Sequence, residues 1–136
     1  MATLVLKDAT ISVGGTDLSD WCQSVTINYS AETPDDTNMG DTTRIVLAGG
    51  MFNWTIDATF SQDFAASAPD TTLFALVGTA VAVIVKPTSA AVSATNPSFT
   101  GTGVLSTYNP IAGAVGDKAT TTATFVAAGN LVRATS

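Results

Sequence analysis

The sequence contains no histidine, and this absence excludes a large part of catalytic and metal-binding chemistry. Without an imidazole there can be no Ser-His-Asp triad, no Cys-His dyad and no His-ligated zinc site. Only one cysteine is present, Cys22, so no intramolecular disulfide can form, and we expect its thiol to be a small buried hydrophobe. The glycine-rich motifs that hold nucleotide phosphates are missing too. The sequence therefore predicts no catalytic residue and no cofactor, and it indicates a protein that is not an enzyme.

Charged residues are scarce, at 12% of the chain, and the net charge is −6 because five basic residues face eleven acidic ones. The basic residues are scattered singly, so none of them forms a patch for several phosphates, and tight nucleic-acid binding is not expected. No apolar run approaches the roughly 20 residues of a membrane helix, so we expect no membrane partner. The first residues lack a basic stretch followed by a long apolar one, which predicts synthesis in the cytoplasm without a secretory signal.

Hydrophobic residues make up 46% of the 136 residues, enough for one domain, residues 1–136, with a core of its own. The clearest strand is Cys22 to Ser30. Its apolar residues Val25, Ile27 and Tyr29 alternate with polar ones, which predicts a strand with one half-buried face.

A second alternating segment covers residues 52–61. Its predicted core face consists of Phe52, Trp54, Ile56, Ala58 and Phe60. We predict that Trp54 anchors the core, whereas an exposed aromatic platform for sugars is the alternative for both Trp21 and Trp54. Asp57 stands on the polar face of this strand, which is either ordinary solvent exposure or the wall of an aqueous channel.

The segment from Ala31 to Gly50 is predicted to be an extended arm or long hairpin, because its first half is rich in turn formers and acids. Its charged residues are Glu32, Asp35, Asp36, Asp41 and Arg44. The register of the acids does not match a calcium loop, whose oxygen ligands must alternate and end in a bidentate acid. A solvated acidic loop is therefore expected, and no metal site.

One short helix is predicted at about residues 68–77, with Ser67 as its cap, Pro69 in its first turn and Gly78 at its end. Further strands are expected at Ala80 to Val85, Phe99 to Tyr108, Ala119 to Val126 and Leu131 to Ala134. Gly101 and Gly103 fall inside a strand, where glycine marks a bulge or close packing. The fold class predicted is all-β, a β-sandwich or barrel-like fold with one short flanking α-helix and a long arm.

From Asp70 onward, four segments follow one another in a distinctive order and spacing. They are Leu73-Phe74-Ala75-Leu76-Val77-Gly78, Val85-Lys86-Pro87, Asn96-Pro97-Ser98-Phe99-Thr100-Gly101 and Gly113-Ala114-Val115-Gly116-Asp117-Lys118-Ala119-Thr120, the last leading into Thr122-Ala123-Thr124-Phe125. This series resembles the C-terminal half of siphophage tail tube (major tail) proteins. The Gly-x-x-Gly-Asp turn and the strand after it are its most specific part.

The resemblance implies a structural virion protein without catalytic residues, made in the host bacterial cytoplasm. It implies six-fold rings that stack into the tail tube of a long-tailed, non-contractile phage. The rings would surround a tape-measure protein, meet tail terminator and baseplate proteins, and let double-stranded DNA pass through without specific binding. The alternatives are an Ig-like carbohydrate- or cell-surface-binding module and another small phage tail or neck protein.

Two sets of site residues follow if the chain forms a tube. Asp57, and secondarily Asp63, are predicted to line the lumen, where acidic side chains repel DNA phosphates. The arm, with Glu32, Asp35, Asp36, Asp41 and Arg44, is predicted to reach a neighbouring subunit or ring.

Overall fold

The computed structural model describes residues 3–136, in which strands predominate and helices are short. The strands are β1 (Thr10–Val13), β2 (Thr16–Asp17), β3 (Cys22–Ala31), β4 (Phe52–Ser61), β5 (Ala80–Lys86), β6 (Ser98–Tyr108), β7 (Thr120–Ala127) and β8 (Val132–Ala134). The helices are α1 (Pro69–Leu73) and the 3₁₀ segments η1 (Ser19–Trp21) and η2 (Phe74–Leu76). The all-β prediction with one short helix is confirmed.

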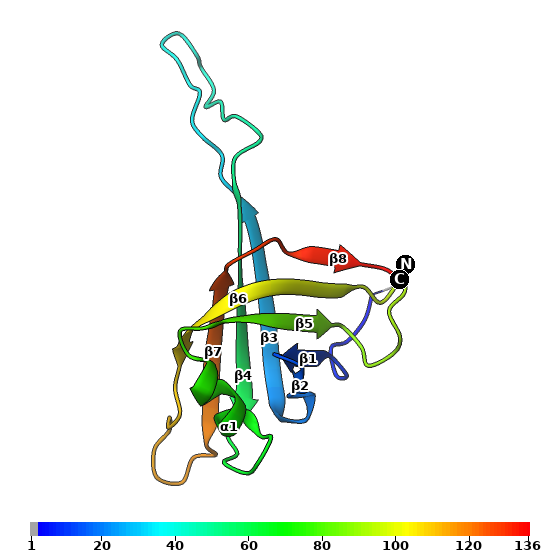
Figure 1. Ribbon diagram of the computed structural model, residues 1–136. Helices are drawn as coiled ribbons and strands as arrows, with labels where there is room; N and C mark the ends of the chain where they lie inside the picture. Colours follow the sequence, from blue (N-terminus) through cyan, green and yellow to red (C-terminus); the bar gives the residue numbers. More distant parts are fainter. Residues whose placement is uncertain (1–2) are drawn as a thin grey trace.

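All the strands belong to one antiparallel sheet whose order is β2-β1-β5-β6-β7-β4-β3, with β8 added to β6. The sheet is strongly curled, so that β3, β4 and β7 form one layer that crosses the layer of β1, β5 and β6 (Figure 1). The core lies between these layers, because apolar residues of β1 and β5 pack in one cluster with those of β4 and β7. The two end strands of the sheet order, β3 and β2, are not paired with each other, which leaves the barrel open.

The alternation in β4 produces the predicted buried face over most of the strand. Trp54, Ile56 and Phe60 are all buried, and Trp54 is 2% exposed. Its indole Nε1 donates a hydrogen bond to the carbonyl of Gly129 at 2.9 Å, so the polar atom of this core residue is satisfied. The prediction for Phe52 is wrong: its side chain is 69% exposed and stacks on Tyr29, with ring centroids 5.5 Å apart. Phe52 is the first residue of β4, next to the arm and beyond the end of the core.

Gly101 and Gly103 make room for the Trp54 ring, so close packing accounts for these two strand glycines. A Cβ atom at Gly101 would lie 2.7 Å from Cζ2 of Trp54, and one at Gly103 would lie 3.1 Å from Cη2. Because real Cβ atoms do not approach so closely, any side chain at Gly101 must displace the indole ring.

Gly101→Ala is therefore expected to destabilise the protein by about 1–3 kcal/mol, as overpacking of a well-packed core typically does. The matched control is Gly129→Ala, because a Cβ there would meet only Thr102 at 3.6 Å, an ordinary contact. Chemical denaturation of both variants measures the difference. Equal stabilities would show that Trp54 shifts without cost.

The predicted helix at residues 68–77 is shorter and less regular than expected. The α-helical part is the five-residue α1, and the chain continues as the 3₁₀ segment η2. Ser67 does not cap it: Ala68 is the cap residue, no side chain caps the helix, and Ser67 has a left-handed φ of 61°. The helix is held from outside, because the Tyr108 hydroxyl donates a hydrogen bond to Asp70 Oδ1 at 2.8 Å. Gly78, with φ 83°, ends the segment as predicted.

Candidate functional site

The outward face of β3, β4 and β7 consists of Ser, Thr and Asn residues in alternate positions, together with Asp57 and, at the end of β7, Val126. The register places Thr26 and Thr124 on either side of Asp57. The Thr124 hydroxyl donates a hydrogen bond to Asp57 Oδ1 at 2.9 Å, which fixes the carboxylate on this face. Within these three strands Asp57 is the only ionisable residue on the face. The surface is thus almost neutral, with the one negative charge of Asp57 near its middle.

Asp63, the second predicted lining residue, lies two positions beyond the end of β4 and is not on that face. Its Oδ2 accepts a hydrogen bond from Trp21 Nε1 at 3.1 Å, and its Oδ1 accepts one from the Ala65 amide at 2.9 Å. The carboxylate therefore holds the loop after β4 against Trp21. The lining role of Asp63 stays a prediction, and these contacts give it a structural role.

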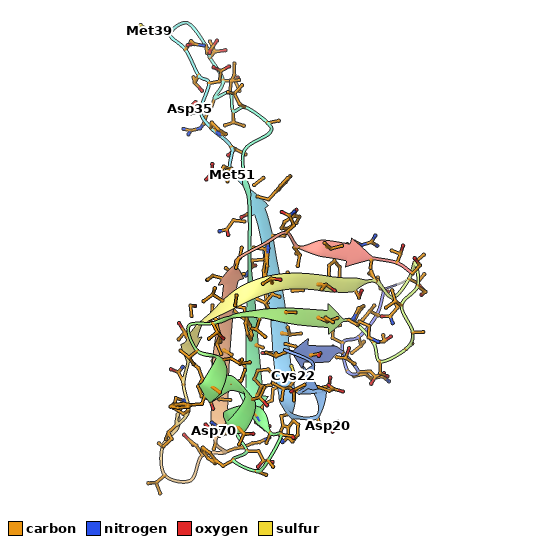
Figure 2. All side chains as sticks on the ribbon, viewed as in Figure 1. Asp20, Cys22, Asp35, Met39, Met51 and Asp70 are labelled. Atoms are coloured by element: carbon orange, nitrogen blue, oxygen red, sulfur yellow. The ribbon has the colours of Figure 1, made fainter. Side chains whose placement is uncertain are left out.

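The arm leaves the end of β3 and β4 and extends far beyond the rest of the subunit (Figures 1 and 2). It is an irregular hairpin held by few hydrogen bonds, among them Leu47 N to Pro34 O at 2.8 Å and Asp36 N to Ile45 O at 2.8 Å. Nearly every arm residue is exposed, including three consecutive apolar ones, Ile45, Val46 and Leu47, at 43%, 47% and 49%. The arm therefore carries apolar surface that nothing in the subunit covers.

The acids of the arm stabilise its turns. The carboxylate of Asp35 accepts hydrogen bonds from the side chain and the backbone amide of Thr37, and these hold its pKa below the usual range. Its Oδ2 lies 3.7 Å from the guanidinium group of Arg44. Asp41 Oδ2 accepts a hydrogen bond from the Asn38 amide at 2.7 Å. Between residues 3 and 136 no three Cys, Asp or Glu residues lie close enough together to hold a metal ion.

The end of the subunit opposite the arm also exposes apolar side chains. α1 and the loop between β6 and β7 lie there (Figure 1). Phe74 beside α1 is 67% exposed, and Ile111 and Val115 in the loop are 86% and 105% exposed. The two ends of the molecule are thus different surfaces, and each has apolar groups without a partner in the subunit.

The Gly-x-x-Gly-Asp motif forms the turn in this loop. Gly113 and Gly116 have φ values of 130° and 92°, which side-chain-bearing residues rarely adopt. Asp117 closes the turn: its amide donates to the Ala114 carbonyl at 3.0 Å, and its Oδ2 accepts from the Ala114 amide at 3.0 Å. The most specific motif in the sequence is therefore a hydrogen-bonded turn in which Val115 is fully exposed.

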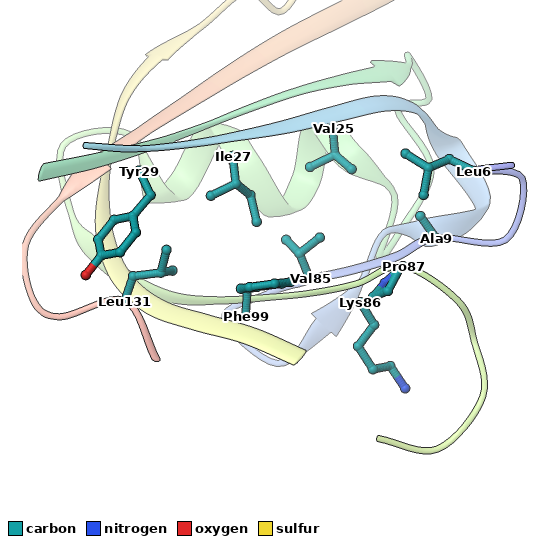
Figure 3. Close-up of a pocket in the computed structure, with 10 residues that line it drawn as sticks. All are labelled: Leu6, Ala9, Val25, Ile27, Tyr29, Val85, Lys86, Pro87, Phe99 and Leu131. Carbon is teal, nitrogen blue, oxygen red and sulfur yellow. The ribbon is translucent and has the colours of Figure 1, made fainter. Parts of the chain in front are cut away.

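The open side of the barrel forms an apolar groove that sequence reasoning did not find (Figure 3). Val25, Ile27 and Tyr29 of β3 point across it toward Val85 and Phe99 of the other layer. Its volume is about 380 Å³, and Leu6, Ala9, Lys86, Pro87 and Leu131 complete its lining. The alternation in β3 was the available signal, because it predicted an apolar face on this strand.

The single cysteine is not activated as a nucleophile. Burial raises the pKa of the Cys22 thiol, which keeps it protonated and a poor nucleophile. Over residues 3–136 there is also no helix with the length and apolar character that crossing a membrane requires.

Comparison with known proteins finds likeness in structure. No protein-family model and no curated protein sequence matches the chain. A chain from the virion of a native gene transfer agent (GTA) particle has 18% sequence identity and a TM-score of 0.76, over 96% of this chain and 98% of that one. A chain from the tail of an empty GTA particle, with C6 symmetry, gives 18% identity and a TM-score of 0.64, over 82% and 81% of the two chains.

The SPP1 tail tube is a third similar structure, at 9% identity and a TM-score of 0.72, over 95% of this chain and 77% of that one. The three structures align with between 82% and 96% of this chain. The chain thus has the fold found in phage and GTA tail structures, as the resemblance in its sequence implied.

Proposed function

We propose that this chain is the subunit of a tail tube, a structural virion protein whose six-fold rings stack into a conduit for double-stranded DNA. The observation that carries the proposal is the likeness to the SPP1 tail tube and to the C6-symmetric GTA tail over most of both chains. A fold alone does not specify function. Three surfaces of the subunit supply the further support.

The polar face of β3, β4 and β7 suits the wall of a DNA conduit. It has no lysine or arginine to bind phosphates. Its hydroxyl and amide groups can form hydrogen bonds with water in the bore. Repetition of Asp57 around each ring places negative charge along the bore, which repels the DNA. We propose this face, with Asp57 near its centre, as the lining of the lumen.

The two unlike ends of the subunit suit head-to-tail stacking. A contact between two different surfaces of identical subunits generates an open, repeating assembly when its rotation does not close a ring. The arm at one end and the loop that displays Val115 at the other are such surfaces. We propose that the arm, including Glu32, Asp35, Asp36, Asp41 and Arg44, contacts a neighbouring subunit or ring.

In this role the protein has no catalytic activity and works in the virion, after synthesis in the host cytoplasm. Its proposed partners are other copies of itself, a tape-measure protein inside the tube, and tail terminator and baseplate proteins at the ends. The burial of Trp54 removes one of the two aromatic residues considered as a sugar platform, so the carbohydrate-binding alternative loses its main support.

Electron microscopy of the purified protein tests the proposal. Tubes of uniform bore with six-fold symmetry are the expected result. Single closed rings that do not stack would indicate a different tail or neck component, and monomers at all concentrations would contradict a tube subunit.

Hydrogen exchange provides a second prediction, which concerns the arm. In the isolated subunit its amides are exposed and held by few hydrogen bonds, so they should exchange quickly. Assembly should slow their exchange sharply, because contacts order flexible segments on binding. Mass spectrometry of monomers and tubes measures this, with β4 amides as the internal control. Equal arm exchange in both states would contradict an assembly role.

A further inference from the structure

The apolar groove is an incomplete part of the core. Val25 and Ile27 on β3 remain half-buried and Tyr29 is 56% exposed, although all three side chains point toward the opposite layer (Figure 3). A cavity of roughly 150 Å³ accommodates a molecule the size of benzene. The groove, at about 380 Å³, therefore has room for more than one aliphatic side chain.

The arm carries a segment of matching size and character. Ile45, Val46 and Leu47 form its only run of three large apolar residues, and each is about half exposed. In its own subunit the arm projects away from the two layers, so it leaves its own groove empty (Figure 1). Every copy of the chain has this exposed apolar segment and this open groove, so the segment of one copy can bind in the groove of another.

Charge favours the same pairing. Lys86 lines the groove, Lys7 lines the adjoining hollow that shares Leu6 and Ala9, and Arg133 is paired with the groove residue Phe99 across β8 and β6. Directly paired residues share a face of a sheet, so Arg133 extends from the face that bears Phe99. None of these three cations makes an ion pair with a described residue. Lys7 and Arg133 thus lie next to residues that line the groove, whereas Lys86 points away from β3 and its Nζ donates a hydrogen bond to the Ala90 carbonyl at 3.1 Å (Figure 3). Asp8 is the acid nearby in sequence.

The arm supplies the complementary charge. It contains four acids and one base, for a net charge of −3, and Asp35 lies directly opposite Val46 in its hairpin. An arm whose apolar segment enters the groove would therefore bring carboxylates close to Lys7 and Arg133. Electrostatic complementarity of this kind fixes orientation and speeds association.

We propose that the groove between β3 and the β5–β6 layer is the receptor for the Ile45–Leu47 segment of a second copy of this chain. The inference rests on the proposed tube and adds the contact that links its subunits. Each subunit then completes the core of another, and the apolar face of β3, with Val25, Ile27 and Tyr29, becomes buried on assembly.

Disulfide trapping between two single-cysteine chains tests this. Both carry Cys22→Ala, one also carries Val46→Cys, and the other carries Ile27→Cys. The two are mixed, assembled and oxidised. A disulfide-linked dimer that appears only when both chains are present and assembled is the expected result. The control replaces Ile27→Cys by Thr59→Cys on the polar face of β4, which should give no dimer.

Each other outcome has a distinct meaning. Normal tubes whose cross-linking does not exceed the control overturn the groove contact and leave the tube proposal intact. A chain with both Val46→Cys and Ile27→Cys that closes an internal disulfide as a monomer shows that the arm fills its own groove, which also overturns it. Failure of the unmodified chain to form tubes in the electron microscope contradicts the proposed function itself.

Discussion

Trp54→Ala is expected to leave the protein insoluble or unfolded, because Trp54 is a large buried aromatic residue of the core between the two layers. Its ring lies so close to Gly101 that a Cβ atom there has no room, and a Cβ atom at Gly103 would make a tight contact at 3.1 Å. Removal of a buried aromatic side chain typically costs about 3–5 kcal/mol, which is a large part of the about 5–15 kcal/mol that stabilises a typical domain. Thermal and chemical denaturation, monitored by near-ultraviolet circular dichroism, measure the loss.

Trp54→Phe separates the two contributions of this residue. Phenylalanine keeps most of the apolar contact but loses the indole N–H that bonds to Gly129. It should therefore cost less than alanine, and leave a folded protein. A Trp54→Ala protein that folds with unchanged stability and loses binding to a glycan would instead support the sugar-platform hypothesis.

The strands were predictable because one face of each is buried. In β4 the alternation of Trp54, Ile56 and Phe60 with polar residues permits only one orientation, since a shift of one residue would expose the whole core face. The bounds of β3 through β7 differ from those predicted by at most one residue at each end. The Gly-x-x-Gly-Asp turn was equally predictable, because its glycines are needed for positive φ.

The features that depend on tertiary structure were not predictable in the same way. Alternation predicts that β3 has an apolar face but does not show what covers it, and here much of that cover is missing. Phe52 continues the apolar alternation of β4 and is nevertheless exposed. The buried positions of this strand begin only two residues later, at Trp54. Ser67 does not cap the short helix: its φ is 61°, and the helix begins one residue later than predicted, with Ala68 as the cap residue.

The candidate site was predictable only in part. The acidic arm and the polar face with Asp57 follow from sequence pattern alone. Asp63 was grouped with Asp57 on charge, but its hydrogen bond to Trp21 depends on a contact between residues 42 positions apart. The groove could not be predicted, because it combines residues from β3, β5 and β6 with residues from the segments that precede β1 and β8.

Asp57→Lys is expected to leave folding and tube assembly nearly intact and to slow or stall DNA ejection. Asp57 is half-buried on the polar face between Thr26 and Thr124, so its replacement removes no apolar contact of the core. A lysine at this position can extend its ammonium group into the proposed bore. Each proposed ring of six would then present six cations in place of six carboxylates. Because a cation on the wall binds phosphate, the same ring that repelled the DNA would now retain it.

The size of the effect depends on repetition along the tail. At physiological ionic strength the Debye length is about 8 Å, so one ammonium group acts only on DNA that passes close to it. Stacked rings repeat the charge along the whole conduit, and the retarding effect accumulates. Tails built with the substitution, tested for assembly by electron microscopy and for genome delivery by release of labelled DNA, measure both properties. Higher salt should restore part of the delivery, since screening weakens phosphate binding.

Two variants define what the result means. Asp57→Asn removes the charge without adding a cation, and it should eject DNA at nearly the normal rate because neutral polar groups dominate the face. Asp20→Lys makes the same charge change at an exposed position in η1, away from this face, and should have no effect on delivery. Normal tubes with unaltered ejection by Asp57→Lys would place the face of β3, β4 and β7 on the outside of the tube.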